Sequence, residues 1–152
     1  MWQLKAFEDL TVKELHAIYF LRTEVFIVEQ ECAYQDVDEW DLVSLHLFNE
    51  VDGELISYAR IIPGESLMKI GRIIVSPRHR KQNKGRELLK TAISYCDDHY
   101  GELPILISAQ AHLEKFYGAF GFKVISEEYL EDGIPHVDMI RNLKEKEGVS
   151  IG

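Results

Sequence analysis

A short basic loop separates an apolar segment from an amphipathic segment near the middle of the 152-residue chain. Residues 73–75 are apolar, Ser76-Pro77 follows them, and the apolar residues after the loop recur at helical spacing. The loop carries six basic residues: Arg78, His79, Arg80, Lys81, Lys84 and Arg86. A strand that leads into a basic, glycine-containing turn and then a helix brings free backbone N–H groups and the positive helix end together. The segment therefore predicts a site for a phosphate group.

A second cluster of charge has the opposite sign. Six carboxylates lie within thirteen residues: Glu29, Glu31, Asp36, Asp38, Glu39 and Asp41. Most runs of like charge are solvated loops, and that is one interpretation of this one. The other is a cleft entrance that attracts a cationic ligand.

Composition narrows the class of partner. The net charge is −9, so the whole chain repels nucleic acid and anionic membrane surfaces, and the basic loop is too short to reverse this. There is no apolar run of the roughly 20 residues that span a bilayer, and residues 1–10 lack a signal-peptide pattern. Cys32 and Cys96 form no metal or redox motif, and Cys96 falls on an apolar helix stripe. We expect a cytoplasmic protein without a bound metal.

The elements that must position these groups alternate between strands and helices. Thr11 and Glu14 match a capping box, which predicts the start of a helix over 11–28. The Asp52-Gly53 pair predicts a hairpin. Further helices are expected from 84 to about 100 and over 111–120, and strands over 2–7, 42–49, 55–62, 68–75, 104–108, 122–125 and 136–140. This order predicts an α/β domain over 1–143 with a mixed sheet, antiparallel first and crossing over by helices later, followed by a polar tail over 144–152.

Four segments of this sequence resemble GNAT-type N-acetyltransferases, and more closely their ElaA-like branch. They are RTEVFIVEQ (22–30), VSPRHRKQNKGREL (75–88), ISAQAHLEKFYGAFGF (107–122) and EDGIPHVDM (131–139), in the family's order and over nearly the whole length. The resemblance implies a single GNAT-like domain, acetyl-CoA as cosubstrate and an amine as acceptor.

The resemblance also assigns the cofactor residues. The family's phosphate loop follows the pattern Arg/Gln-x-x-Gly-x-Gly/Ala, and here Asn83 replaces its first glycine. Asparagine adopts the left-handed backbone region more readily than other non-glycine residues, so the loop can still form. The residues implied to hold the pyrophosphate are Arg80, Lys81, Gln82, Asn83, Lys84, Gly85 and Arg86, and those implied to present backbone to the pantetheine arm are Ile73, Ile74 and Val75.

Gln110 and Tyr117 match the family's Asn-x-x-Ala-x-x-x-Tyr pattern. By resemblance, Gln110 hydrogen-bonds the pantetheine, and Tyr117 is the general acid beside the CoA sulfur. Transfer of acetyl to an amine expels a thiolate, which a phenol can protonate or stabilise.

The acceptor side has no such assignment. Many relatives place a glutamate on the strand before the phosphate loop, but residues 69–73 (KIGRI) carry no carboxylate. The candidates for the base that deprotonates the acceptor are Glu29, Asp38, His46 and His136. Three of them have an alternative role: Glu29 as the partner of Arg22 in an ion pair, His46 as a hydrogen-bonded strand histidine, and His136 as a residue that closes the pocket. Asp41 and His46 show no ligand spacing that supports a metal site.

The hypothesis from the sequence is therefore direct acetyl transfer from acetyl-CoA to a small, cationic amine, with Tyr117 as general acid. The alternative is a non-catalytic acyl-CoA-binding sensor or interaction module of the same fold, favoured by the missing strand glutamate and by Asn83. The apolar C-terminal strands would permit a homodimer.

Overall fold

The computed structural model describes residues 1–101 and 103–142. Three α-helices and eight strands are distributed along this part of the chain, with short 3-10 and π-helical segments between them. In order they are β1 (Trp2–Ala6), α1 (Val12–Arg22), β2 (Leu45–Val51), β3 (Glu54–Ile62), β4 (Met68–Val75), α2 (Lys84–Tyr100), β5 (Ile105–Gln110), α3 (Glu114–Gly118), β6 (Lys123–Val124), β7 (Tyr129–Glu131) and β8 (Ile134–Arg141). The predicted α/β class is confirmed; the tail expected over 144–152 lies outside the described residues.

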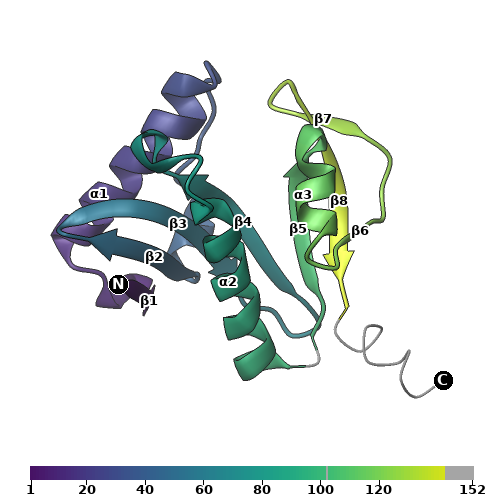
Figure 1. Ribbon diagram of the computed structural model, residues 1–152, viewed down its shortest axis with the longest axis horizontal. Coiled ribbons are helices and arrows are strands. Elements are labelled where there is room, and N and C mark those ends of the chain that lie inside the picture. The colour runs from purple at the N-terminus through teal and green to yellow at the C-terminus, as the bar shows by residue number, and fades with distance from the viewer. Residues whose placement is uncertain (102, 143–152) are drawn as a thin grey trace.

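The eight strands form one mixed sheet that divides in the middle. Its order is β1-β2-β3-β4-β5-β8-β6, with β7 paired to β8. Strands β1 to β4 are antiparallel neighbours, whereas β4 and β5 are parallel and pair only through Met68 with Ile105 and Lys69 with Leu106. Beyond those pairs the two strands diverge (Figure 1). The divergence leaves the facing edges of β4 and β5 open.

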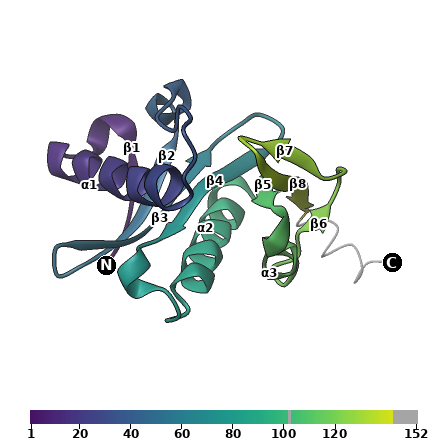
Figure 2. The same ribbon diagram turned by 90° about the horizontal axis from the view of Figure 1, so that it is seen from above.

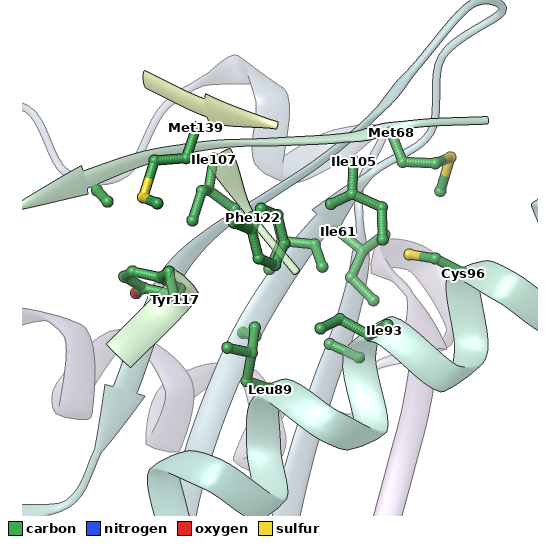
Figure 3. Packing of buried hydrophobic residues seen from close by; sticks show 14 of the residues in the cluster. Ile61, Met68, Leu89, Ile93, Cys96, Ile105, Ile107, Tyr117, Phe122 and Met139 are labelled. Carbon is green, nitrogen blue, oxygen red and sulfur yellow. The ribbon is translucent and has the colours of Figure 1, made fainter. Parts of the chain in front are cut away.

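Helices cover both faces of the sheet. Phe48 and Tyr58 pack with α1. Leu47, one position before Phe48, and Ile61, three positions after Tyr58, point to the opposite face and pack with α2. The larger core cluster lies between α2 and strands β3, β4, β5 and β8, with Phe122 in its middle and Tyr117 at one side (Figure 3). Helices α2 and α3 lie on the same side of the sheet (Figure 2).

Two local signals of the sequence form as expected. The Thr11 hydroxyl accepts from the Glu14 N–H at 3.0 Å, and the Glu14 carboxylate accepts from the Thr11 N–H at 2.9 Å, which completes the capping box of α1. Asp52 and Gly53 both have positive φ, at 51° and 77°, as a tight turn between β2 and β3 requires.

Three elements differ from the prediction. The helix expected over 11–28 is α-helical only to Arg22, and residues 23–29 continue as a π-helix with wider hydrogen-bond spacing. The helix expected over 111–120 is a short 3-10 turn followed by the five-residue α3. Strand β7 was missed, because three residues are too few to show a periodic pattern. Of the helices described, none is long and apolar enough to cross a membrane.

Candidate active site

A cleft of about 960 Å3 opens where β4 and β5 diverge. Residues 70–75 of β4 form one wall, and side chains of β5, α3 and the β7–β8 hairpin form the other. Within the described residues, 70–75 have no β5 partner, so that edge can pair with a ligand, although the Val75 carbonyl oxygen accepts from the Arg80 side chain at 3.4 Å. A chain of amides can bind such an edge as an added strand would.

The basic loop borders one end of the cleft. Lys81 and Asn83 both adopt the left-handed region, at φ 66° and 59°, and Asn83 is the residue before α2. Their conformation turns the chain into the N-terminus of α2, after the short 3-10 turn Pro77–His79 that follows β4. Arg80 and Lys81 line the cleft, whereas Asn83 and Arg86 border a shallower hollow beside it, where the Arg86 guanidinium lies 5.3 Å from the centre of the Phe120 ring. The left-handed Asn83 is consistent with the expectation that asparagine can replace the family's glycine.

Arg80 of this loop forms an ion pair with Glu29 of the π-helical segment. Two hydrogen bonds join the guanidinium and the carboxylate, at 2.6 and 2.7 Å. They lower the pKa of Glu29 and keep its carboxylate ionised. The partner expected as a structural alternative was Arg22, and that pairing is wrong, because the π-helical segment carries Glu29 over the cleft, away from the buried Arg22.

Tyr117 lies on α3 between the core and the cleft. Its ring makes edge contacts with Phe116 and Phe122, at centroid distances of 5.2 and 6.1 Å. Burial raises the pKa of Tyr117 to about 12, so the phenol stays protonated. Within the described part of the chain its hydroxyl has no hydrogen-bond partner, and Tyr117 also lines the cleft. The hydroxyl is therefore free to donate to a ligand. Gln110, at the end of β5, lines the same cleft.

His46 does not reach the cleft. It is fully buried in β2, with Nδ1 2.6 Å from the Tyr58 hydroxyl and Nε2 2.9 Å from the Asp41 carbonyl oxygen. Burial lowers its pKa, which keeps it neutral. Both ring nitrogens are engaged, so the geometry supports the structural interpretation of His46 and gives it no access to an acceptor.

The acidic segment is largely neutralised. Asp36 and Asp41 are buried and bind Arg22, at 2.9 and 2.7 Å. Asp38, the other predicted base, pairs with Arg60 at 2.7 Å and with a third arginine, Arg72. These carboxylates anchor the segment to α1 and the sheet, so the expectation that they face solvent is wrong for Asp36 and Asp41, whereas the Asp38 side chain is 28% exposed.

Arg72 reaches this network from an irregularity in β4. The register shifts between Tyr58 and Arg60 of β3, and Arg72 on β4 has a φ of 51°. A bulge redirects a side chain, and here the Arg72 guanidinium lies 2.8 Å from Asp36 and 5.8 Å from the centre of the Tyr34 ring. Arg72 and Tyr34 both line the cleft. Neither residue was identified from the sequence, since nothing in the local pattern marks a bulge in an apolar strand.

The β7–β8 hairpin closes the opposite end of the cleft, called here the hairpin end. Glu131, Asp132, Ile134 and His136 line it. His136 is buried, and its Nδ1 lies 2.7 Å from the Ile134 carbonyl oxygen while its Nε2 lies 3.7 Å from the Glu131 carboxylate. The Cys32 thiol donates to the Asp132 carbonyl oxygen at 3.3 Å and so links the segment after the π-helix to the hairpin. Among residues 1–101 and 103–142, no three His, Cys, Asp or Glu side chains converge as a metal site.

A mixed sheet that divides between β4 and β5, with a basic turn and a helix N-terminus at one end of the cleft, defines an acyl-CoA N-acyltransferase fold. The chain belongs to the acetyltransferase (GNAT) domain family, which it matches over residues 8–143.

Three relatives from different organisms support this assignment. An UPF0039 protein of Schizosaccharomyces pombe is 45% identical over 89% of this chain and 92% of its own. The protein ElaA of Escherichia coli is 40% identical over 93% of this chain and 96% of its own, and its crystal structure superposes with a TM-score of 0.90. An acyl-CoA N-acyltransferase from Pseudomonas aeruginosa is 43% identical, with a TM-score of 0.88 over 93% of this chain and 99% of its own. The ElaA-like resemblance is confirmed.

Proposed function

We propose that this protein transfers acetyl from acetyl-CoA directly to the amine of a small, cationic acceptor. The observation that carries the proposal is that the basic loop, the open edge of β4 and Tyr117 all border the same cleft. A cosubstrate with a pyrophosphate at one end and a thioester at the other needs these three features in this order.

The residues present fit CoA. The loop from Arg80 to Arg86 supplies positive side chains and precedes the N-terminus of a 17-residue helix, which favours an anion. Residues Ile73, Ile74 and Val75 on the open edge of β4 can pair with the amides of the pantetheine arm. Gln110 on the facing strand adds a side-chain amide that can hydrogen-bond the same arm.

Tyr117 acts in the proposal as a hydrogen-bond donor to the departing sulfur. An ordinary thiol has a pKa near 8.5, well below the pKa of about 12 that burial gives Tyr117. The phenol is therefore a weaker acid than the thiol. Its proton stays on oxygen while the hydrogen bond stabilises the thiolate. The proton that finally neutralises the thiolate comes from the acceptor amine or from solvent.

The cysteines have no role in this route. Cys96 is buried in the core and burial raises its pKa to about 12, so it is a poor nucleophile. The Cys32 thiol donates its hydrogen bond to a backbone carbonyl, and the proposal needs no acetyl-cysteine intermediate. Replacement of both should leave activity largely intact.

The proposal that the acceptor is cationic rests on the acidic residues at the hairpin end of the cleft. Because the carboxylates of Asp36, Asp38 and Asp41 are paired with arginines, they attract a cation weakly. Glu131 and Asp132 line the cleft opposite the basic loop, and the Glu131 side chain is 53% exposed. An acceptor that carries an ammonium group is favoured beside them.

A panel of amines tests this proposal. Acetyl transfer to polyamines, aminoglycosides and lysine-containing peptides would be compared with transfer to neutral amines and to amino-acid α-amines, by thiol release from acetyl-CoA. A thermal-shift screen with acetyl-CoA present would select the amines. Preferred transfer to the cationic amines supports the proposal. If only neutral or acidic amines were acetylated, the assignment of a cationic acceptor would be wrong.

A further inference from the structure

In the proposed function, no residue has been assigned to remove the proton from the acceptor. An ammonium group has no lone pair, so its proton must leave before nitrogen attacks the thioester. His46 and Asp38 are engaged in the network described above, and Glu29 is bound to Arg80 by two hydrogen bonds. His136 differs from them, because its ring nitrogen Nε2 has no hydrogen-bond partner within the described residues.

The contacts of His136 determine its tautomer. A carbonyl oxygen can only accept, so the 2.7 Å contact with Ile134 places the proton on Nδ1. The neutral ring then carries its lone pair on Nε2. Glu131 lies 3.7 Å from Nε2, beyond hydrogen-bond distance but close enough to stabilise a positive charge on the ring.

The ring of His136 is also fixed in orientation. It stacks on Tyr129, with a centroid distance of 6.1 Å and an interplanar angle of 26°. The Tyr129 hydroxyl donates to Asp138 and lies at hydrogen-bond distance from the Ser108 hydroxyl. On the other side of the β8 backbone, His136 is in register with Gln110 of β5.

The titratable groups around His136 come from each element near it. Glu131 and Tyr129 face it from β7, Asp132 lies in the adjoining turn, and His112 lines the same cleft after β5. Among these, the carboxylate of Glu131 is the group in charge-pair distance of the ring. A ring nitrogen with a lone pair, beside a carboxylate and on a residue that lines the cleft, is suited to act as a general base.

We propose that His136 is the general base toward the acceptor amine and that Glu131 stabilises its protonated form. The inference rests on the proposed acetyl transfer to an amine. Nε2 takes a proton from the acceptor ammonium, and the freed lone pair on nitrogen forms a C–N bond to the thioester carbonyl carbon. The C–S bond then breaks, the sulfur leaves as a thiolate that receives a hydrogen bond from Tyr117, and the new amide nitrogen loses its second proton to that thiolate. The imidazolium returns its proton to solvent past the exposed Glu131.

The variant His136→Asn tests the assignment. Asparagine keeps a donor near the position of Nδ1 for the Ile134 carbonyl, but it cannot take a proton. With an alkyl amine acceptor at pH 7, we expect kcat/KM for the amine to fall by about 10²–10⁴-fold, the usual contribution of a general base. The affinity for acetyl-CoA should not change.

The pH dependence separates a base from a structural residue. An ordinary alkyl amine has a pKa near 10.4, so it is largely deprotonated above that pH and no longer needs the base. The deficit of His136→Asn should therefore shrink to less than about tenfold near pH 10.5, and it should be equally small at pH 7 with an amine of pKa below 7. The conservative variant Glu131→Gln should lose no more than about fivefold, as expected for an exposed pair.

His99→Asn is the matched control, because His99 also contacts a backbone carbonyl through Nδ1 but lies on α2 outside the cleft. It should keep wild-type activity. A His136→Asn deficit that stays constant across pH and across acceptor amines, or no deficit, would overturn the assignment while the proposed function stands. A wild-type protein that binds acetyl-CoA but acetylates no amine overturns the proposed function, and the assignment of His136 with it.

Discussion

Removal of the Tyr117 hydroxyl should separate turnover from cofactor binding. In Tyr117→Phe the ring keeps its edge contacts with Phe116 and Phe122, so the wall of the cleft keeps its shape. The hydroxyl has no partner among the described residues, so its loss costs the free protein no hydrogen bond. We expect the free energy of unfolding to change by less than about 1 kcal/mol, since the substitution removes no hydrogen bond within the described part of the protein.

The expected loss of turnover follows from the raised pKa of Tyr117. Because that pKa is about 12, the hydroxyl contributes a hydrogen bond to the thiolate and not a transferred proton. A hydrogen bond to a charged group contributes about 1.5–3 kcal/mol, and 1.36 kcal/mol corresponds to tenfold in rate. The variant should therefore lose about 10- to 150-fold in kcat.

Steady-state thiol release and calorimetric titration with CoA measure the two quantities. Tyr95→Phe is the control, because Tyr95 lies on α2 and stacks on His99 outside the cleft. The wild-type rate should also show no decline from ionisation of Tyr117 below about pH 11. Turnover within threefold of wild type, or parallel losses of turnover and CoA affinity, would refute this role. An inactive wild type that binds CoA would instead favour the non-catalytic module.

Three further perturbations address the ion pairs. Glu29→Gln removes the carboxylate that competes with a pyrophosphate for Arg80, so the Kd for CoA should fall by up to about fivefold in titration calorimetry. A weaker affinity for CoA would contradict this competition. Arg22→Met leaves Asp36 and Asp41 buried without their partner, and the free energy of unfolding in urea should drop by about 3–5 kcal/mol; a drop below 1 kcal/mol would be inconsistent with the network. Burial raises the pKa of Asp41, but the hydrogen bonds from Arg22 outweigh this effect and leave the pKa below its ordinary value of 3.8. The carboxyl therefore contributes stability that is present above that pH and is lost as the pH falls through its folded-state pKa. Asp41→Asn should flatten the acid limb of the stability curve.

Matched surface variants control for the change of charge. Glu39→Gln removes an exposed carboxylate of the same segment without touching the cleft and should leave the Kd for CoA unchanged. Arg78→Met removes a guanidinium that is 58% exposed and paired with Glu54, and it should change the free energy of unfolding by less than about 1 kcal/mol.

Much of the fold follows from local patterns in the sequence. The capping box of Thr11 and Glu14, the Asp52-Gly53 turn and the apolar stripe of α2 each depend on residues within a few positions of one another. The order of these elements then restricts the sheet to a mixed one with helical crossovers. The divergence of β4 from β5 does not follow from such patterns, because it depends on the register between residues far apart in the sequence, such as Met68 and Ile105.

The site was less accessible to the same reasoning. Which carboxylates are free depends on which arginines fold against them, and Arg22, Arg60 and Arg72 come from three different elements. The sequence shows the acidic cluster of residues 29–41 but not that four of its members, Glu29 among them, are paired with arginines. The location of His46 is a similar case: periodicity placed it on a strand, and only the packing of Tyr58 and Asp41 around it shows that it faces the interior.

The two walls of the cleft are held with unequal strength, which bears on how an acceptor enters. The segment around Asp36 is fixed to α1 by Arg22 and to β4 by Arg72, through buried or half-buried ion pairs. The hairpin belongs to the other half of the sheet, which joins β4 through two residue pairs. At the hairpin end of the cleft, the segment after the π-helix is joined to the hairpin by a hydrogen bond from the Cys32 thiol to the Asp132 carbonyl oxygen. A thiol is a weak donor. Because that bond is weaker than the arginine pairs, opening at the hairpin requires less free energy than displacement of the Asp36 segment. If the protein transfers acetyl as proposed, we predict that the acceptor enters beside His136 when the bond between Cys32 and Asp132 opens.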